Sequence, residues 1–202
     1  MPENINKKSL VILNFLYKYR QLENANTIAK ILDMDSRSVS QSLKYLHGRG
    51  LIEIQENCIA ITVRGDKFID EYFSNVLKHK VKDKKALEDL IYEFKGLDYH
   101  FKTIIMRWQV RADSQKRLLE FLEKINEEVK TKIISKLVDY IPWIQEYGRR
   151  LDLALERVRQ GDTLYLVKDR GSYYNTWYEM KDDIYRLGRL FKIDLRPVVV
   201  PW

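Results

Sequence analysis

Residues 27–51 read TIAKILDMDSRSVSQSLKYLHGRGL, and this stretch carries the strongest structural signal in the chain. Apolar residues recur at helical spacing up to Leu32, and a tight polar turn follows at residues 33–35. Beyond the turn, Val39, Leu43 and Leu46 are spaced i, i+4 and i+7, so they share one face of a second helix. Two helices joined by so short a turn are typical of a helix-turn-helix.

The starts of the helices are predicted from residues that can cap them. A helix is expected over residues 9–19, with Ser9 as its cap. Asn26 is expected to cap the short helix that ends at Leu32, and Ser36 the helix that follows the turn.

A short β-hairpin is predicted after the helix-turn-helix. Apolar residues alternate along residues 52–54 and 59–63, with turn residues between the two runs. A further helix is expected over residues 68–77. Three helices followed by a two-stranded hairpin and a helix predict a winged helix-turn-helix in residues 1–80.

The same region resembles the MarR-type winged-helix transcription regulators. The resemblance is carried by residues 27–32, 36–46 and 50–52, and by residues 62–65, Thr-Val-Arg-Gly, which are similar to the Leu-Thr-x-x-Gly that follows the wing in that family. It covers roughly residues 6–78, a bit over a third of the chain. The resemblance implies a domain that binds duplex DNA and regulates transcription.

The face of the third helix opposite its apolar residues is polar and basic. Arginine and glutamine suit the edges of guanine and adenine, whereas serine and lysine suit backbone phosphates. The alternative is an ordinary solvated helix face. The tip of the hairpin is a weaker candidate because it carries Glu56, whereas Arg49 and Arg64 at its base suit phosphates. The residues predicted to contact DNA are Arg37, Ser38, Ser40, Gln41, Lys44, Tyr45, Arg49 and Arg64.

Composition narrows the class of protein and of partner. The 202 residues include 36 basic and 29 acidic side chains, a net charge of +7 that favours a polyanionic partner. A hydrophobic content of 45% predicts a globular protein. The single cysteine, Cys58, excludes an intramolecular disulfide, and it is either a redox sensor or a half-buried strand residue. No stretch is apolar and long enough for a signal peptide or a membrane span, so we expect a cytoplasmic protein without a membrane partner.

Residues 81–202 are predicted to form an all-α domain after a linker at 78–85. A short tail at 198–200 is expected to be extended and able to pair along a sheet edge. The fold class is therefore mainly α, a winged helix-turn-helix followed by a helical domain for dimerisation and effector sensing. Helices are expected near residues 84–95, 98–111, 113–138, 143–160 and 172–191.

The helical part holds all 4 tryptophans, interleaved with arginines and lysines. This combination suits either core packing or a pocket for an anionic or planar small molecule. Segments 101–109, 147–162 and 172–179 resemble the helical extension of actinobacterial winged-helix proteins, whose function is poorly defined. That group has histidines where this chain has Tyr174 and Lys181, so the resemblance implies no metal site here. The polar residues that match, and are candidates for binding a ligand, are Lys102, Trp108, Gln109, Arg150, Ser172, Tyr173, Trp177 and Glu179.

Enzyme chemistry is not indicated. The 3 histidines are scattered, and the sequence has no glycine-rich phosphate loop and no nucleophile elbow. The compact carboxylate group of Glu179, Asp182 and Asp183 is interpreted as a solvated charged face. We therefore expect no enzyme, no cofactor and no metal.

The sequence favours a transcription regulator that binds double-stranded DNA and whose helical domain forms a homodimer, senses a small anionic or aromatic ligand, or does both. Two recognition helices related by a twofold axis would read a palindrome, and the long helix 114–138 is expected to offer one apolar stripe to its own core and another to a partner. The alternative is an interaction adaptor whose winged helix binds protein. A third option, a single-strand or RNA binder, would need aromatic side chains exposed for stacking.

Overall fold

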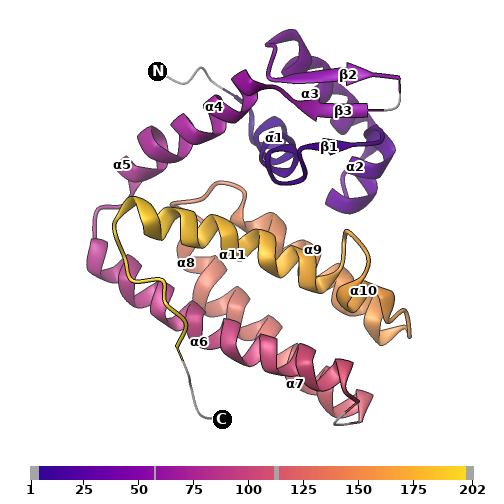
Figure 1. Cartoon of the computed structure of the whole chain (residues 1–202), viewed down its shortest axis with the longest axis vertical. Helices are drawn as coiled ribbons and strands as arrows, with labels where there is room; N and C mark the ends of the chain where they lie inside the picture. Colours follow the sequence, from indigo (N-terminus) through magenta and orange to yellow (C-terminus); the bar gives the residue numbers. More distant parts are fainter. Residues whose placement is uncertain (1–4, 57, 112–113, 199–202) are drawn as a thin grey trace. The chain divides into compact units, whose positions relative to one another are not determined.

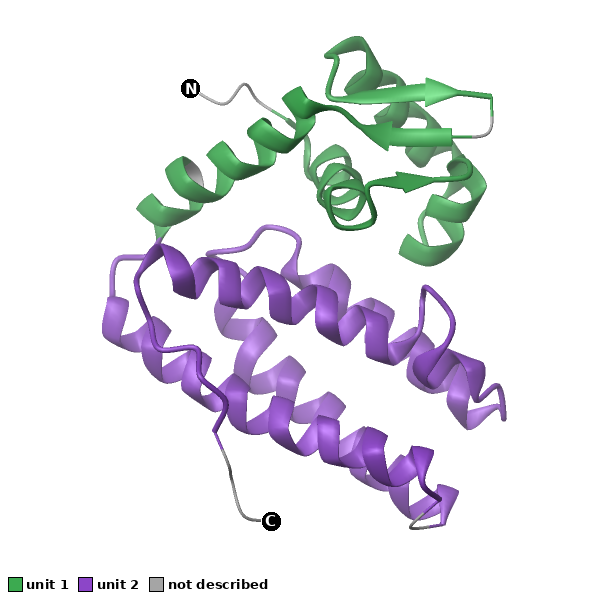
Figure 2. Cartoon of the chain, viewed as in Figure 1, with its two compact units in different colours: residues 1–80 green, residues 81–202 purple. Residues whose placement is uncertain are grey.

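The computed structural model describes residues 5–56, 58–111 and 114–198. Within them the chain is mainly helical, with one small antiparallel sheet (Figure 1). The chain packs as two compact units, residues 1–80 and 81–202 (Figure 2).

The first unit combines helices with a three-stranded sheet. The strand order is β1-β3-β2, and both pairings are antiparallel. A π-helical turn, η1 (Tyr72–Leu77), continues helix α4 into the short helix α5 (Lys78–Lys80). The other elements are α1 (Lys7–Tyr19), β1 (Gln21–Leu22), α2 (Ala25–Leu32), α3 (Ser36–Gly48), β2 (Ile52–Gln55), β3 (Cys58–Ile61) and α4 (Val63–Glu71).

The caps of the first three helices differ from those predicted. In each helix a residue further upstream accepts a hydrogen bond from a backbone N–H of the first turn, and these residues are Asn6, Asn24 and Asp35. The predicted caps, Ser9, Asn26 and Ser36, therefore lie inside their helices. Asn and Asp are among the best capping residues, so these side chains can start the helices upstream of the predicted caps.

The second strand of the hairpin ends earlier than predicted. Ile52 pairs with Ile61, and Ile54 pairs with Ile59. Val63, expected in the second strand, is instead the first residue of α4, because the Thr62 hydroxyl caps that helix by accepting from the Gly65 N–H.

The core of the first unit lies between the helices and one face of the sheet. Helix α1 contributes Ile12, Leu13 and Leu16, and α3 contributes Val39 and Leu46, all of them fully buried. Each such side chain stabilises the fold by about 1.5–3 kcal/mol relative to an exposed one. The opposite face of α3 remains outside the core.

The second unit is a bundle of helices. Its longest helix is uninterrupted at Gly96, where a break was predicted, because Phe94, Leu97 and Phe101 continue one buried face across the glycine. The short α10 was not predicted. Val198 belongs to no strand, and residues 199–200 lie outside the described residues. The elements are α6 (Lys84–Gln109), α7 (Gln115–Glu128), η2 (Val129–Ile134), α8 (Ser135–Leu137), α9 (Ile144–Arg159), α10 (Leu164–Val167) and α11 (Tyr173–Leu190).

Stacked aromatic rings form the centre of the second unit between α6 and α11. The ring centroid of Trp177 lies 4.5 Å from that of Phe101 and 5.6 Å from that of Phe94. Tyr173 continues the stack at 6.2 Å from Trp177. These rings are fully buried, so these aromatic residues pack in the core, which was one of the two uses expected for them.

The segment α7-η2-α8 turns its apolar residues inward. Leu118, Leu122 and Leu137 are buried, whereas Leu119 and Phe121 are half-buried. No apolar residue of this segment belongs to the exposed large hydrophobic side chains of the described chain. The second apolar stripe that was expected to contact a partner is therefore not exposed on this segment.

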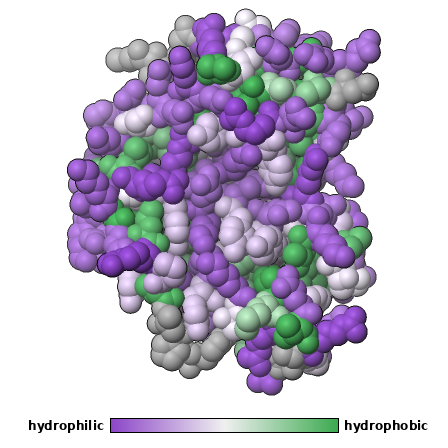
Figure 3. All heavy atoms as spheres, viewed as in Figure 1, coloured by the Kyte–Doolittle hydropathy of each residue, from purple (hydrophilic) through white to green (hydrophobic). Residues whose placement is uncertain are grey.

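On the face drawn in Figure 3 the surface is mostly hydrophilic, and the hydrophobic residues form small separate groups. Among the described residues, no helix combines the length and apolar character that crossing a bilayer requires.

Candidate functional site

Helix α3 carries a stripe of polar and basic side chains opposite its buried face. Arg37, Ser40, Gln41 and Lys44 are exposed, and their i, i+3, i+4, i+7 spacing puts them side by side along the helix. The helix contains no carboxylate. None of these side chains has a hydrogen bond or ion pair with another described residue. The stripe is therefore open to an acceptor-rich or anionic partner.

The start of α3 is held by contacts with α1. Lys8 Nζ donates to the Ser38 hydroxyl at 2.8 Å and lies 4.0 Å from the Asp35 carboxylate. Hydrogen bonds from the Ser38 side chain and backbone N–H lower the pKa of Asp35, and Lys8 adds to this effect. Lys8 was not among the predicted residues, because the first helix was expected to begin only at Ser9.

Two further predicted DNA contacts lie at the end of α3. The Arg49 guanidinium donates to the Tyr45 hydroxyl at 2.7 Å and lies 5.5 Å from the Tyr45 ring centroid. Arg64, in the first turn of α4, is exposed, and its guanidinium lies near the turn after α3, since a Cβ placed on Gly50 would be 3.7 Å from Arg64 Nη1. Arg49 and Arg64 therefore lie near the C-terminal end of α3, whereas Arg37 lies in its first turn.

The hairpin offers an acidic surface rather than a basic one. Glu53 and Glu56 are exposed, and the Ile54 side chain is 42% exposed between them. Cys58 is half-buried, and its thiol is 3.9 Å from Gln21 Oε1. Phosphates would be repelled by the hairpin, so α3 and its flanks are the better candidate surface.

In the second unit, Arg150 and Glu179 form a buried ion pair. The two guanidinium nitrogens lie 2.7 and 2.8 Å from the two carboxylate oxygens. The side chains are only 3% and 7% exposed. A bidentate pair of this kind joins α9 to α11, and both members were predicted as ligand-binding residues.

The prediction of a solvated carboxylate face on α11 is wrong for Glu179 and Asp183. Asp183 is fully buried and accepts from Trp143 Nε1 at 2.6 Å and from the Tyr147 hydroxyl at 2.5 Å. Burial, together with the charge of Asp183, raises the pKa of Tyr147. Only Asp182 is exposed. The buried carboxylates are tolerated because they have donors on α9 and in the turn before it.

A second buried carboxylate, Asp98, gathers two of the predicted residues. It accepts from Trp177 Nε1 at 3.1 Å, from Lys181 Nζ at 2.7 Å and from Lys102 Nζ at 2.9 Å. Burial lowers the pKa of Lys181, whereas the bond to Asp98 raises the pKa of Lys102 against the effect of burial. The sequence analysis missed Asp98, since its partners on α11 are about 80 residues away.

Ser172 and Tyr173 have structural contacts at the start of α11. The Ser172 hydroxyl caps the helix by accepting from the Asn175 N–H, and the Tyr173 hydroxyl donates to Asn126 Oδ1 at 3.2 Å. The ligand-binding candidates are thus spread over several buried contacts, and Trp108 lies apart from them. Ligand binding by these residues stays a prediction.

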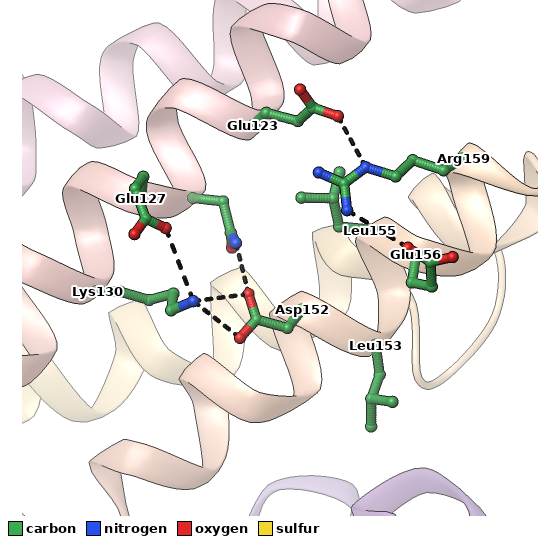
Figure 4. A pocket seen from close by; sticks show the side chains of 9 residues that line it. Glu123, Glu127, Lys130, Asp152, Leu153, Leu155, Glu156 and Arg159 are labelled. Atoms are coloured by element: carbon green, nitrogen blue, oxygen red, sulfur yellow. Dashed lines mark hydrogen bonds and ion pairs between the residues drawn. The ribbon is translucent and has the colours of Figure 1, made fainter.

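A groove of about 580 Å³ lies between α7, η2 and α9 (Figure 4). Its charged side chains face one another in pairs. Lys130 Nζ lies 2.9 Å from Asp152, and Arg159 Nε lies 2.8 Å from Glu123. Each of these cations is paired with a carboxylate of the neighbouring helix. We therefore interpret the charged residues of this groove as contacts that hold the helices together.

A second cavity, of about 510 Å³, lies where α6 ends and α7 begins. Its lining residues are Trp108, Arg111, Gln115, Leu118 and Thr163. Trp108 is the one ligand-binding candidate from the sequence that this cavity contains. The described residues contain no cluster of three or more side chains suited to hold a metal ion.

No family model, curated protein or solved structure matches this chain. The resemblance to MarR-type regulators therefore rests on the residues of the first unit quoted above.

Proposed function

We propose that this protein is a DNA-binding transcription regulator whose residues 1–80 form a winged helix-turn-helix. Helix α3 is the recognition helix in this proposal, and the hairpin of β2 and β3 is the wing. The order of elements α1-β1-α2-α3-β2-β3-α4 supports the proposal because it contains the three-helix core and hairpin that such a domain needs.

The observation that carries the proposal is the open stripe on α3. Arg37 and Gln41 can make bidentate contacts with guanine and adenine edges in the major groove. Lys44 and the serines suit phosphates, which set the register of the helix without reading sequence. Lys8, which lies against Ser38, would add a phosphate contact from α1.

The acidic wing restricts how the domain would meet DNA. Glu53 and Glu56 disfavour insertion of the hairpin tip into a groove, so phosphate contacts would come from Arg49 and Arg64 at its base. A homodimer on a palindrome and a cytoplasmic location remain part of the proposal, with residues 81–202 as the part that dimerises or senses an effector.

The alternative, a winged-helix adaptor, is favoured by the hairpin. Ile54 is exposed beside Glu53 on β2, which is an edge strand of the sheet. An edge strand with an exposed apolar residue can pair with a partner protein. DNA binding is preferred because the α3 stripe, unlike the hairpin, has cations without carboxylates.

Single substitutions on α3 test the proposal. Arg37→Ala and Gln41→Ala should each cost about 1–3 kcal/mol at a cognate duplex and relax the preference at one base position. Lys44→Ala should weaken all duplexes alike and reduce the dependence of affinity on salt. Fluorescence anisotropy with labelled duplexes measures both effects.

Lys67→Ala is the matched control, because Lys67 is an exposed cation on α4 outside the stripe. If the three α3 variants bind duplexes like Lys67→Ala, α3 is not the reading helix and the adaptor becomes the better interpretation.

A further inference from the structure

The cavity at the junction of α6 and α7 is built by three separate segments. Trp108 comes from the last turn of α6, Gln115 and Leu118 from the first turns of α7, and Thr163 from the segment between α9 and α10. Leu118 is buried and provides an apolar wall, and Trp108 is half-buried. A volume of about 510 Å³ is within the range of small-molecule sites.

The polar side chains of this cavity can all donate hydrogen bonds, and none of them has a side-chain partner among the described residues. No side-chain hydrogen bond or ion pair joins Trp108, Arg111, Gln115 or Thr163 to another described residue. The groove of Figure 4 differs in this respect, since its cations are bound to carboxylates. Among the described residues that line the cavity, none carries a carboxylate.

The surroundings of the cavity favour an anion. Lys116 and Arg117 follow Gln115 in the first turn of α7 and are exposed. The N-terminus of this 14-residue helix adds the positive end of its dipole, although Ser114 occupies one of the first N–H groups. An Arg guanidinium beside a helix N-terminus suits a phosphate group, which offers more acceptors and more charge than a carboxylate.

From this geometry we propose that the cavity binds a mononucleotide, with the phosphate at Arg111 and Gln115 and the planar base on the ring of Trp108. A base has a flat apolar surface that stacks on an indole, and Leu118 excludes water behind it. Val110 and Leu164 are each adjacent in sequence to a lining residue and are 67% and 55% exposed, which gives the rim apolar surface for the sugar and base.

This inference rests on the proposed function only in naming the ligand as the effector of a regulator. Binding of the nucleotide needs no DNA. A failure of the site would therefore leave the DNA-binding proposal intact, and a failure of DNA binding would leave the site intact.

Titration calorimetry of the full chain with AMP tests the site. We expect a dissociation constant below about 1 mM for AMP, and at least tenfold weaker binding of adenosine and of inorganic phosphate, because each lacks one half of the contacts. Arg111→Gln should weaken AMP binding about tenfold or more, since it removes the charge that meets the phosphate. Trp108→Leu should weaken AMP and adenosine alike.

Arg117→Gln is the matched control, because Arg117 is an exposed cation at the same end of α7 that does not line the cavity. It should bind AMP within about twofold of the unaltered chain. The inference is overturned if AMP binds no more tightly than adenosine and phosphate, or if Arg111→Gln and Arg117→Gln have the same affinity for AMP. Circular dichroism of Arg111→Gln, an exposed position, checks that the fold is retained.

Discussion

The Arg150–Glu179 ion pair of the second unit is buried, unlike an ordinary ion pair on a protein surface. Both side chains are almost wholly removed from water, and each guanidinium nitrogen at the carboxylate has its own oxygen. An exposed pair contributes about 0–1 kcal/mol, whereas breaking a buried one leaves a charge without compensation. The pair therefore matters for folding whether or not a ligand binds nearby.

Replacing Arg150 by methionine should reduce the free energy of unfolding by about 3–5 kcal/mol, because Glu179 would remain buried without a cation. Urea denaturation of the full chain followed by circular dichroism measures the loss. Arg149→Met is the control, since the neighbouring Arg149 pairs with Glu146 at a partly exposed site and its loss should cost about 1 kcal/mol or less. Equal losses in the two variants would show that burial does not set the cost.

For individual residues, the sequence correctly indicated which face of α3 is exposed, but wrongly indicated that the carboxylates of α11 are solvated. Val39, Leu43 and Leu46 repeat at helical spacing, and this local pattern sufficed to place Arg37 and Gln41 on the exposed side. The burial of Asp183 depends on Trp143 and Tyr147, which are 40 and 36 residues away. A spacing pattern on one helix contains no information about donors that a distant helix supplies.

Among the elements, long helices were predictable because each has a regular apolar face. The two-residue strand β1 was not, since Gln21–Leu22 is too short for alternation and exists through pairing with Ala60 and Ile59 of β3. At Gly96 a helix break was predicted, but helix α6 continues through it. A glycine in a helix costs about 1 kcal/mol relative to alanine, which the buried residues on both sides of it offset in α6.

The junction of α4 with the hairpin depends on the lack of a side chain at Gly65. A Cβ there would lie 2.1 Å from the carbonyl oxygen of Leu51 and 2.7 Å from Cγ1 of Ile61. Gly65→Ala should therefore destabilise the first unit by about 1–3 kcal/mol, because backbone atoms would have to move. Thermal unfolding followed by circular dichroism measures this.

Gly48→Ala provides the comparison, since a Cβ at Gly48 has no neighbour within 4 Å. Alanine at this last position of α3 should leave stability unchanged or raise it by up to about 1 kcal/mol. If Gly65→Ala is as stable as Gly48→Ala, the close approach between α4 and the hairpin is not a constraint on the fold.

For the molecule as a whole, the net charge of +7 is less informative than where the charges lie. The hairpin is acidic, the groove between α7 and α9 pairs its charges internally, and α3 presents cations with no carboxylate on the same helix. Of these surfaces, α3 is the one whose charge pattern suits duplex DNA.

Selection of duplexes from a random library by the full chain, at about 50 and 200 mM salt, is the experiment we would perform first. The proposed function predicts enrichment of a palindrome with half-sites about 34 Å apart, and loss of that enrichment in the triple variant Arg37→Ala/Gln41→Ala/Lys44→Ala. Binding without enrichment of any sequence, or the same enrichment by the triple variant, would show that α3 does not read DNA.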